Sequence, residues 1–252
     1  MSHTLDTGKF QLVYRESDID NPLLWERHFH AQFEMIGVLE GDIVIMLEGK
    51  KYRLQEKQTA IISPLCYHTV TANVNSRYRR VTALFDAAAI AQPIREHFTG
   101  EIAIFAAPQM ERLKQLCQKA DPHYGPLADA LMTQCLYACA ESGQDGSSIE
   151  TDAFLRQAID YIDRHLYEKI RLADLASFTS RSESSFSHLF TKKMNISPKQ
   201  YILQKKLALA NRLIREGMPA TAVAARLGYE NYSNFYRLYL KQYATAPTHH
   251  RR

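Results

Sequence analysis

A short helical pattern occurs twice in the C-terminal half of this chain, and this duplication constrains the fold more than any other feature. Ala176 recurs as Ala224, 48 residues later, and Phe186 recurs as Phe235, 49 residues later. In each copy a short apolar helix is followed by a polar turn and a second helix with an aromatic face. The repeat predicts an all-α domain that contains two helix-turn-helix units, at about residues 172–193 and 221–243.

Capping residues mark where the helices of this half begin and end. Ser182 is the predicted N-cap of a helix from Glu183 to Lys193. Between the two units, Ser197 and Pro198 have the N-cap and first-position chemistry of a long helix that runs toward Glu216. Gly217 follows as its stop signal.

The charge of the chain changes sign near residue 145. Residues 1–145 carry 14 Lys and Arg against 18 Asp and Glu, whereas residues 146–252 carry 17 against 9. From Arg181 onward 13 basic residues face 3 acidic ones, an excess that attracts a polyanion. The polar Gly/Ser stretch at this point predicts a flexible connection. We therefore expect a domain at 1–142, a linker at 143–149 and a second domain at 150–252.

The first hundred residues predict an antiparallel sandwich or barrel. Short β-branched runs, separated by turn signals, predict strands at 32–39, 42–47, 52–54 and 59–63. After Pro93 the apolar residues recur every three or four positions, which predicts helices at 109–119 and 126–140. The whole chain is therefore predicted to be a two-domain α+β protein.

Hydropathy and cysteine spacing argue against a membrane-spanning protein and against a secreted disulfide scaffold. No apolar run approaches the ~18 residues of a membrane span, and the N-terminus lacks a secretory signal pattern. The four cysteines lack metal-binding or disulfide-scaffold spacing, so we expect buried, reduced thiols. These features predict a cytoplasmic protein without a membrane partner.

A histidine-rich motif lies at the start of the predicted sheet. His28, His30 and Glu34 are spaced to share one face of a strand, and His68 follows on another strand. Three imidazoles and a carboxylate can ligate a divalent metal. The same groups can instead line a polar pocket, or form a merely structural cluster, with Trp25, Phe29 and Tyr67 as neighbouring aromatics.

The pattern H-x-H-x3-E-x6-G followed by P-x3-H resembles the paired motifs of the cupin barrel over about residues 10–90. Metal-dependent cupin enzymes use these four positions as ligands. Here Pro64-Leu65-Cys66-Tyr67-His68 lacks the usual Gly and is one residue shorter, as in sensor cupins attached to DNA-binding domains. The resemblance implies an N-terminal cupin-like barrel that needs no cofactor and has an effector pocket of Trp25, His28, His30, Glu34 and His68. A divalent metal on His28, His30, Glu34 and His68 is the alternative.

Several motifs of the second half resemble the DNA-binding domain of AraC/XylS-type transcription regulators over about residues 150–252. They are L-A before the first turn, F-S-x-L-F, S-P-x-Q-Y-I, A-x-x-x-G-Y and N-Y-S-x-F-Y-R. The chain departs from the family at Ser180-Arg181, where Gly and an aliphatic residue are common, and at Lys206, where Arg is usual. The final signature also differs, at 247–252.

The resemblance implies that the second helix of each unit enters the DNA major groove, about one turn (~34 Å) apart. Positions that match the family's base-contacting residues are Ser184, Ser185, Ser187, His188, Tyr232, Ser233, Asn234, Tyr236 and Arg237. Arg237 is the strongest candidate, because a guanidinium can bond guanine O6 and N7 together. Expected phosphate contacts are Arg181, Lys192, Lys193 and Lys241. Tyr239 is expected to pack in the core, whereas packing and base contact stay open for Tyr232 and Tyr236.

Together these features predict a transcription regulator that binds double-stranded DNA and is controlled by a small effector such as a sugar or related metabolite. RNA polymerase and a second copy of the chain are the other expected partners. A dimer face could combine Leu113, Leu116 and Ala120 with Leu131, Gln134 and Ala138, although these residues could equally pack on their own barrel. Two alternatives remain: a metal-dependent cupin isomerase or dioxygenase with a basic appendage, and a regulator whose barrel only dimerises.

Overall fold

The computed structural model of the chain describes residues 2–17, 29–72, 77–98, 100–142 and 146–247. The chain divides into two compact units. The first is Met1–Leu47 with Lys51–Glu150, and the second is Glu48–Lys50 with Thr151–Arg252. Among the described residues, no helix is both long and apolar enough to span a membrane.

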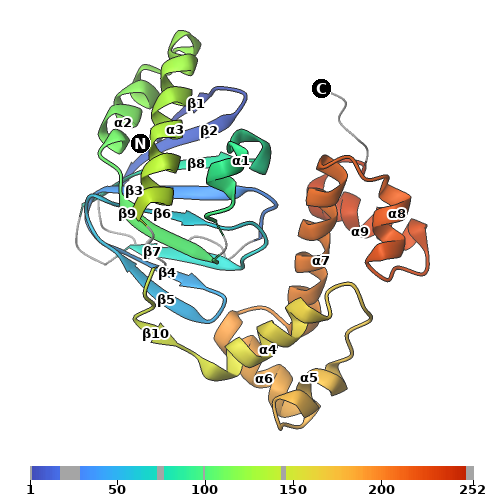
Figure 1. Cartoon of the computed structure of the whole chain (residues 1–252). Helices are drawn as coiled ribbons and strands as arrows, with labels where there is room; N and C mark the ends of the chain where they lie inside the picture. The colour runs from blue at the N-terminus through green and yellow to red at the C-terminus, as the bar shows by residue number, and fades with distance from the viewer. Residues whose placement is uncertain (1, 18–28, 73–76, 99, 143–145, 248–252) are drawn as a thin grey trace. The chain divides into compact units, whose positions relative to one another are not determined.

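Two sheets form the framework of the first unit (Figure 1). One has the strand order β1-β2-β8-β3-β6-β9 and the other the order β10-β5-β4-β7. The strands are β1 (Ser2–Asp6), β2 (Phe10–Ser17), β3 (Phe33–Glu40), β4 (Ile43–Leu47), β5 (Lys50–Leu54), β6 (Gln58–Ile62), β7 (His68–Ala72), β8 (Tyr78–Phe85), β9 (Ile102–Ala106) and β10 (Glu150–Thr151). The predicted sheet-rich fold of this region is confirmed.

Turn chemistry explains how the central strands are joined. Gly41, between β3 and β4, has a φ of 85°, and its Cβ would lie 2.5 Å from the carbonyl oxygen of Arg77. Only glycine fits such a position without strain. The predicted strands at 32–39, 42–47 and 59–63 match β3, β4 and β6 within one residue at each end.

The helices predicted at 109–119 and 126–140 are present, but the sequence analysis did not predict β9, which lies between the short helix α1 (Gln92–Arg95) and the first of them. Its residues pair with β6 along the edge of the six-stranded sheet. A five-residue apolar run carries too little periodicity to distinguish a strand from a buried helical turn. The strand forms because β6 offers it an edge.

Helices α2 (Gln109–Lys119) and α3 (Gly125–Ser142) pack on the six-stranded sheet (Figure 1). The approach is close, because a Cβ on Gly37 of β3 would lie 2.5 Å from Met110 of α2. Leu113 and Leu116 are completely buried in this core. Of the two alternatives left open for these residues, packing on their own unit holds for Leu113 and Leu116, since both cover the sheet.

The cysteines are confirmed as buried thiols. Cys66, Cys117, Cys135 and Cys139 are all unbonded to one another and buried. Burial raises the pKa of Cys117 to about 11 and that of Cys135 and Cys139 to about 12. Thiols of this kind carry no reactive thiolate near neutral pH.

The described end of the predicted linker has backbone partners in the first unit. The Ile149 N–H donates to the Lys51 carbonyl oxygen at 2.8 Å, and β10 follows at the edge of the four-stranded sheet. Residues 143–145 lie outside the described part of the chain. The chain passes into the second unit at Thr151.

The second unit is helical, as predicted. Its helices are α4 (Ala153–Arg164), α5 (Leu172–Phe178), α6 (Glu183–Met194), α7 (Pro198–Arg215), α8 (Ala220–Arg226) and α9 (Tyr232–Tyr243). Ser182 and Ser197 cap α6 and α7 by accepting bonds from Ser185 N and Gln200 N. Helix α7 has α4–α6 at one end and α8 and α9 at the other (Figure 1).

Candidate functional site

Helix α6 is the second helix of the first helix-turn-helix unit. Phe186 and Phe190 are completely buried, which fixes the inner face of the helix. The predicted base-contacting residues lie on the other side: Ser184, Ser185 and His188 are exposed and Ser187 is half-buried. Hydroxyl groups and one imidazole therefore form the outer surface of this helix.

Helix α9, the second helix of the second helix-turn-helix unit, presents larger polar side chains than α6. Phe235 and Tyr239 are buried, and the Tyr239 hydroxyl donates to Asn211 Oδ1 at 3.0 Å, so the predicted packing role of Tyr239 is correct. The predicted base-contacting residues of this helix are all exposed: Tyr232, Ser233, Asn234, Tyr236 and Arg237.

Arg237 and Asn234 are bonded to each other. Arg237 Nη2 donates to Asn234 Oδ1 at 3.1 Å, a spacing of one helical turn. A guanidinium has five N–H donors, so this bond leaves others to face a base edge. The bond also restrains the Arg237 side chain, which lowers the entropy lost when it binds.

The predicted phosphate-contacting residues differ in their surroundings. Lys192 and Lys241 are exposed. Arg181 lies over the ring of Phe154, 5.1 Å from its centroid. Lys193 Nζ is 2.5 Å from Asp152 Oδ2, and the same aspartate caps α4. Burial alone would raise the pKa of Asp152, but the bonds donated by Lys193 and the Leu155 N–H outweigh it and lower the pKa.

The turns of the two units differ as the sequence indicated. Ser180 in the first turn has a φ of 54°, whereas Gly228 in the second has a φ of 78°. A left-handed conformation costs a non-glycine residue roughly 1–2 kcal/mol, so Ser180 is a strained substitute for glycine.

Lys206, the other departure, lies buried in α7. Its Nζ donates to the carbonyl oxygens of Glu168 and Leu227 at 2.6 and 2.8 Å. It therefore links the segment before α5 to the end of α8 within this unit.

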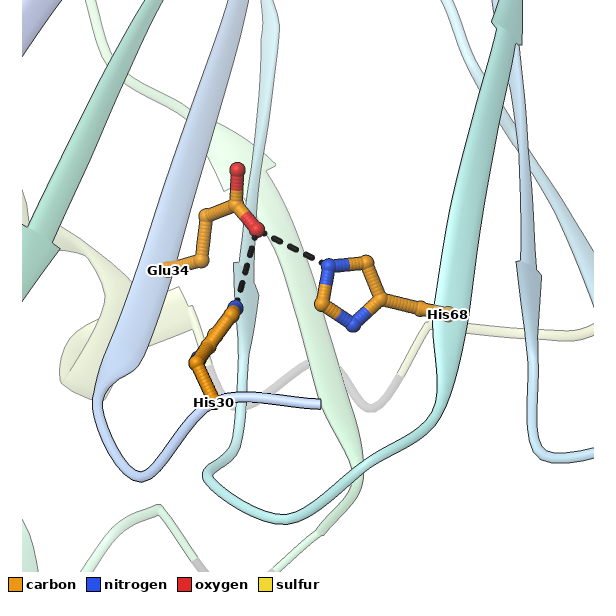
Figure 2. Close-up of side chains that lie close together, drawn as sticks. All are labelled: His30, Glu34 and His68. Atoms are coloured by element: carbon orange, nitrogen blue, oxygen red, sulfur yellow. Dashed lines mark hydrogen bonds and ion pairs between the residues drawn. The ribbon is translucent and has the colours of Figure 1, made fainter. Parts of the chain in front are cut away.

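In the first unit, two histidines contact the carboxylate of Glu34 (Figure 2). His30 Nε2 lies 3.1 Å and His68 Nε2 2.9 Å from the same carboxylate oxygen, Oε2. The Nδ1 atoms face the backbone carbonyl oxygens of Gln32 and Cys66, at 2.6 and 2.9 Å, which orients both rings toward Glu34. Burial alone would raise the pKa of Glu34, but the bonds to both histidines hold it well below its usual range.

The predicted geometry of this cluster needs a correction. His30 precedes β3, and the chain bends at Ala31 and Gln32, so the two-residue alternation of a strand does not relate His30 to Glu34. His30 reaches the carboxylate from the bend instead. Trp25 and His28, the other predicted members, lie outside the described residues.

The three described members have the chemistry of a metal site as well as of a hydrogen-bonded cluster. Their ligand atoms lie within 4.8 Å of one another. Imidazoles anchored through Nδ1 on a carbonyl are how proteins orient metal-binding histidines. His30, Glu34 and His68 would therefore be the described ligands if a divalent ion replaced the two hydrogen bonds.

A cavity of about 490 Å³ opens beside Glu34, between the inner faces of the two sheets. This volume is within the range of small-molecule sites. Its lining residues are Thr4, Asp6, Gln11, Val13, Arg15, Glu34, His68, Val70, Arg80, Thr82 and Leu84. Glu34 and His68 were predicted as pocket residues, whereas His30 contacts the cavity only through Glu34.

The aromatic neighbours serve packing. The rings of Phe29 and Tyr67 lie 4.8 Å apart, and neither belongs to the cavity lining. The residues that the sequence did not single out come mostly from β2 and β8. Their signal is the two-residue period of a strand, which places Arg80, Thr82 and Leu84 of β8 on one face.

The C-terminal half of the chain matches a family model, and one relative is similar over most of the chain. A family model described as a helix-turn-helix domain matches residues 175–252. The probable transcriptional regulator LumQ of Photobacterium leiognathi is 39% identical over 90 residues, which are 35% of this chain and 36% of LumQ. The uncharacterized HTH-type transcriptional regulator YobQ of Bacillus subtilis is 26% identical over 233 residues, 89% of this chain and 88% of YobQ.

Solved structures give a looser match. ToxT of Vibrio cholerae is 9% identical, covers 96% of both chains and superposes with a TM-score of 0.42. A probable AraC family transcriptional regulator from Rhodopseudomonas palustris is 23% identical over 38% of this chain and 93% of its own, with a TM-score of 0.36.

Proposed function

Because this chain is an AraC-type DNA-binding transcription regulator, we propose that it recognises a specific DNA sequence with both of its helix-turn-helix units at once. The metal-dependent enzyme considered as an alternative falls away with that identification. One protomer would cover two short DNA elements, read by α6 and α9.

One observation carries the DNA part of the proposal. Two helix pairs lie at the ends of a single helix, and each places exposed polar side chains on its second helix. Helix α7 has 18 residues, which is about 27 Å of helix, comparable with one turn of DNA. The segment that contains them has the large basic excess that favours a polyanion.

Changing the spacing of the two DNA elements tests this arrangement. Inserting half a helical turn of DNA (~5 base pairs) between the elements is expected to weaken binding about tenfold, because the base contacts of one unit are lost. Inserting a full turn (~10 base pairs) should not restore binding, since α7 fixes the separation of the units. The measurement is titration of the full chain on sites obtained by selection from random DNA. Full recovery at a full turn would contradict the single-protomer arrangement.

For the first unit we propose that the cavity beside Glu34 binds the small-molecule effector. The cavity has the size of a metabolite site, and charged side chains converge in it with apolar Val13, Val70 and Leu84. A ligand present at about 100 times its Kd would stabilise this unit by ~2.7 kcal/mol, which makes a rise in Tm the direct test. If no metabolite raised the Tm, the barrel-only dimerisation alternative would take the place of this proposal.

His30→Ala is expected to weaken effector binding about tenfold. The affinity of the effector-free protein for DNA should not change. His30 contributes one of the two bonds that orient Glu34 at the cavity, and a bond to a charged group contributes about 1.5 kcal/mol at the low end. The measurement is the effector concentration that gives half of the Tm shift. His97→Ala, at an exposed histidine of the same unit, is the control. An unchanged midpoint would remove His30 from the effector response.

Dimerisation and contact with RNA polymerase stay predictions. Of the expected dimer-face residues, Ala120 and Gln134 are exposed, and Leu131 and Ala138 pack partly against the core of their own unit.

A further inference from the structure

Two arginines stand side by side in the cavity of the first unit. Arg15 of β2 is the direct cross-strand partner of Arg80 of β8, and both side chains line the cavity. Directly opposed side chains in an antiparallel pair have Cβ atoms about 4.5–5.5 Å apart. Like charges directly opposite each other destabilise a sheet.

Burial makes this arrangement costly. Arg80 is only 4% exposed, and its guanidinium carbon lies 5.7 Å from the centroid of the Tyr78 ring. Desolvation lowers the pKa of Arg80, and the charge of Arg15 acts in the same direction. Tyr78 and Glu34 act the opposite way, and the Oε2 of Glu34 also accepts from both histidines. An anion placed against the arginine pair would stabilise both charges.

We propose that the effector is a small organic monocarboxylate whose carboxylate is bound jointly by Arg15 and Arg80. This inference rests on the proposed function, since it names the chemical class of the ligand for the same cavity. Planar guanidinium groups suit the two oxygens of a carboxylate, which they can bind in bidentate fashion.

The rest of the lining limits the ligand further. Glu34 and Asp6 also face the cavity. They lie on opposite sides of it in the sheet, because Glu34 pairs with Leu84, Leu84 with Gln11, and Gln11 with Asp6. Two carboxylates in the lining repel a second negative charge, which disfavours dicarboxylates and phosphate esters. Val13, Val70 and Leu84 provide contact for an apolar body.

The test pairs carboxylates with neutral analogues on the full-length chain. Benzoate, hexanoate and gluconate are compared with benzamide, hexanamide and glucose, and succinate and a sugar phosphate serve as doubly charged probes. The Tm shift ranks the compounds, and calorimetry gives the Kd of those that bind. We expect one or more monocarboxylates to bind and their neutral partners to fail.

Arg80→Met should raise the Kd of the monocarboxylate that binds by about 10- to 150-fold. This corresponds to about 1.5–3 kcal/mol, the contribution of hydrogen bonds to a charged group. Arg79→Met is the matched control, because Arg79 lies on the same strand but pairs with Glu16 and Glu40 outside the cavity. Arg15→Met should weaken the same ligand in the same direction.

The possible outcomes separate the two proposals. If neutral analogues bind as well as the acids, or if Arg80→Met binds like Arg79→Met, the carboxylate inference is wrong and the effector cavity stands. Tighter binding of the sugar phosphate or succinate overturns the monocarboxylate assignment alone. If no probe of either series binds, the carboxylate inference fails, and the metabolite screen of the preceding section then decides the effector proposal separately.

Discussion

Replacing Lys205 by methionine is expected to lower the free energy of unfolding of the second unit by about 3–5 kcal/mol. Lys205 Nζ lies 3.0 Å from Glu48 Oε1 and 2.5 Å from Asp163 Oδ1. Tyr201 donates its hydroxyl to Glu48 Oε2 at 2.5 Å. Glu48 is only 2% exposed, so removing the lysine takes away the cation that pairs with a buried carboxylate.

Urea unfolding of the full chain, followed by the helical circular dichroism signal, measures this loss. Lys199→Met, at an exposed lysine of the same helix, is the matched control and should change stability by less than about 0.5 kcal/mol. The double variant Glu48→Gln/Lys205→Met should recover most of the loss, because it no longer buries an unpaired charge. Equal effects of the two lysine substitutions would show that the ion pair does not stabilise this unit.

Arg237→Ala is expected to reduce discrimination at one base position by about 1–3 kcal/mol, which is about 5- to 150-fold. The side chain is exposed on α9, and its bond to Asn234 holds it on the outer face of the helix. Its loss should flatten the preference at one position of the selected site and leave the other positions unchanged. Affinities of the full chain for single-base variants of that site measure the effect.

Lys192→Ala provides the comparison for Arg237→Ala. A phosphate contact has no base preference, so this variant should weaken all sequences alike and reduce the slope of log affinity against log salt by about 1. If both variants had the same sequence profile and the same salt slope, the division into base-contacting and phosphate-contacting residues would be wrong.

The helices of the second unit could be predicted from the sequence because their signals are local. Ser182, Ser197 and Gly217 act within one turn of the helix end that they mark. Helix α9 ends at the residue predicted for the end of the second unit, and α6 ends one residue later than predicted. Periodicity also indicated which aromatic residues of these helices would be buried.

The cavity could be predicted only in part. Glu34 and His68 stood out because histidines and carboxylates at short spacing are conspicuous in a sequence. Arg15 and Arg80 did not, since nothing near either residue indicates that the other will be its partner. The contribution of Glu48 was equally hidden, because this turn residue finds its buried lysine in a helix far along the chain.

The two-part organisation, the duplicated helix pairs and the polar surface of their second helices follow from local signals, because capping, helical periodicity and charge act between residues that are close along the chain. The cavity depends instead on contacts between strands. The pairing of β2 with β8 sets Arg15 against Arg80, and a shift of one residue in that register would move one arginine to the opposite face of the sheet.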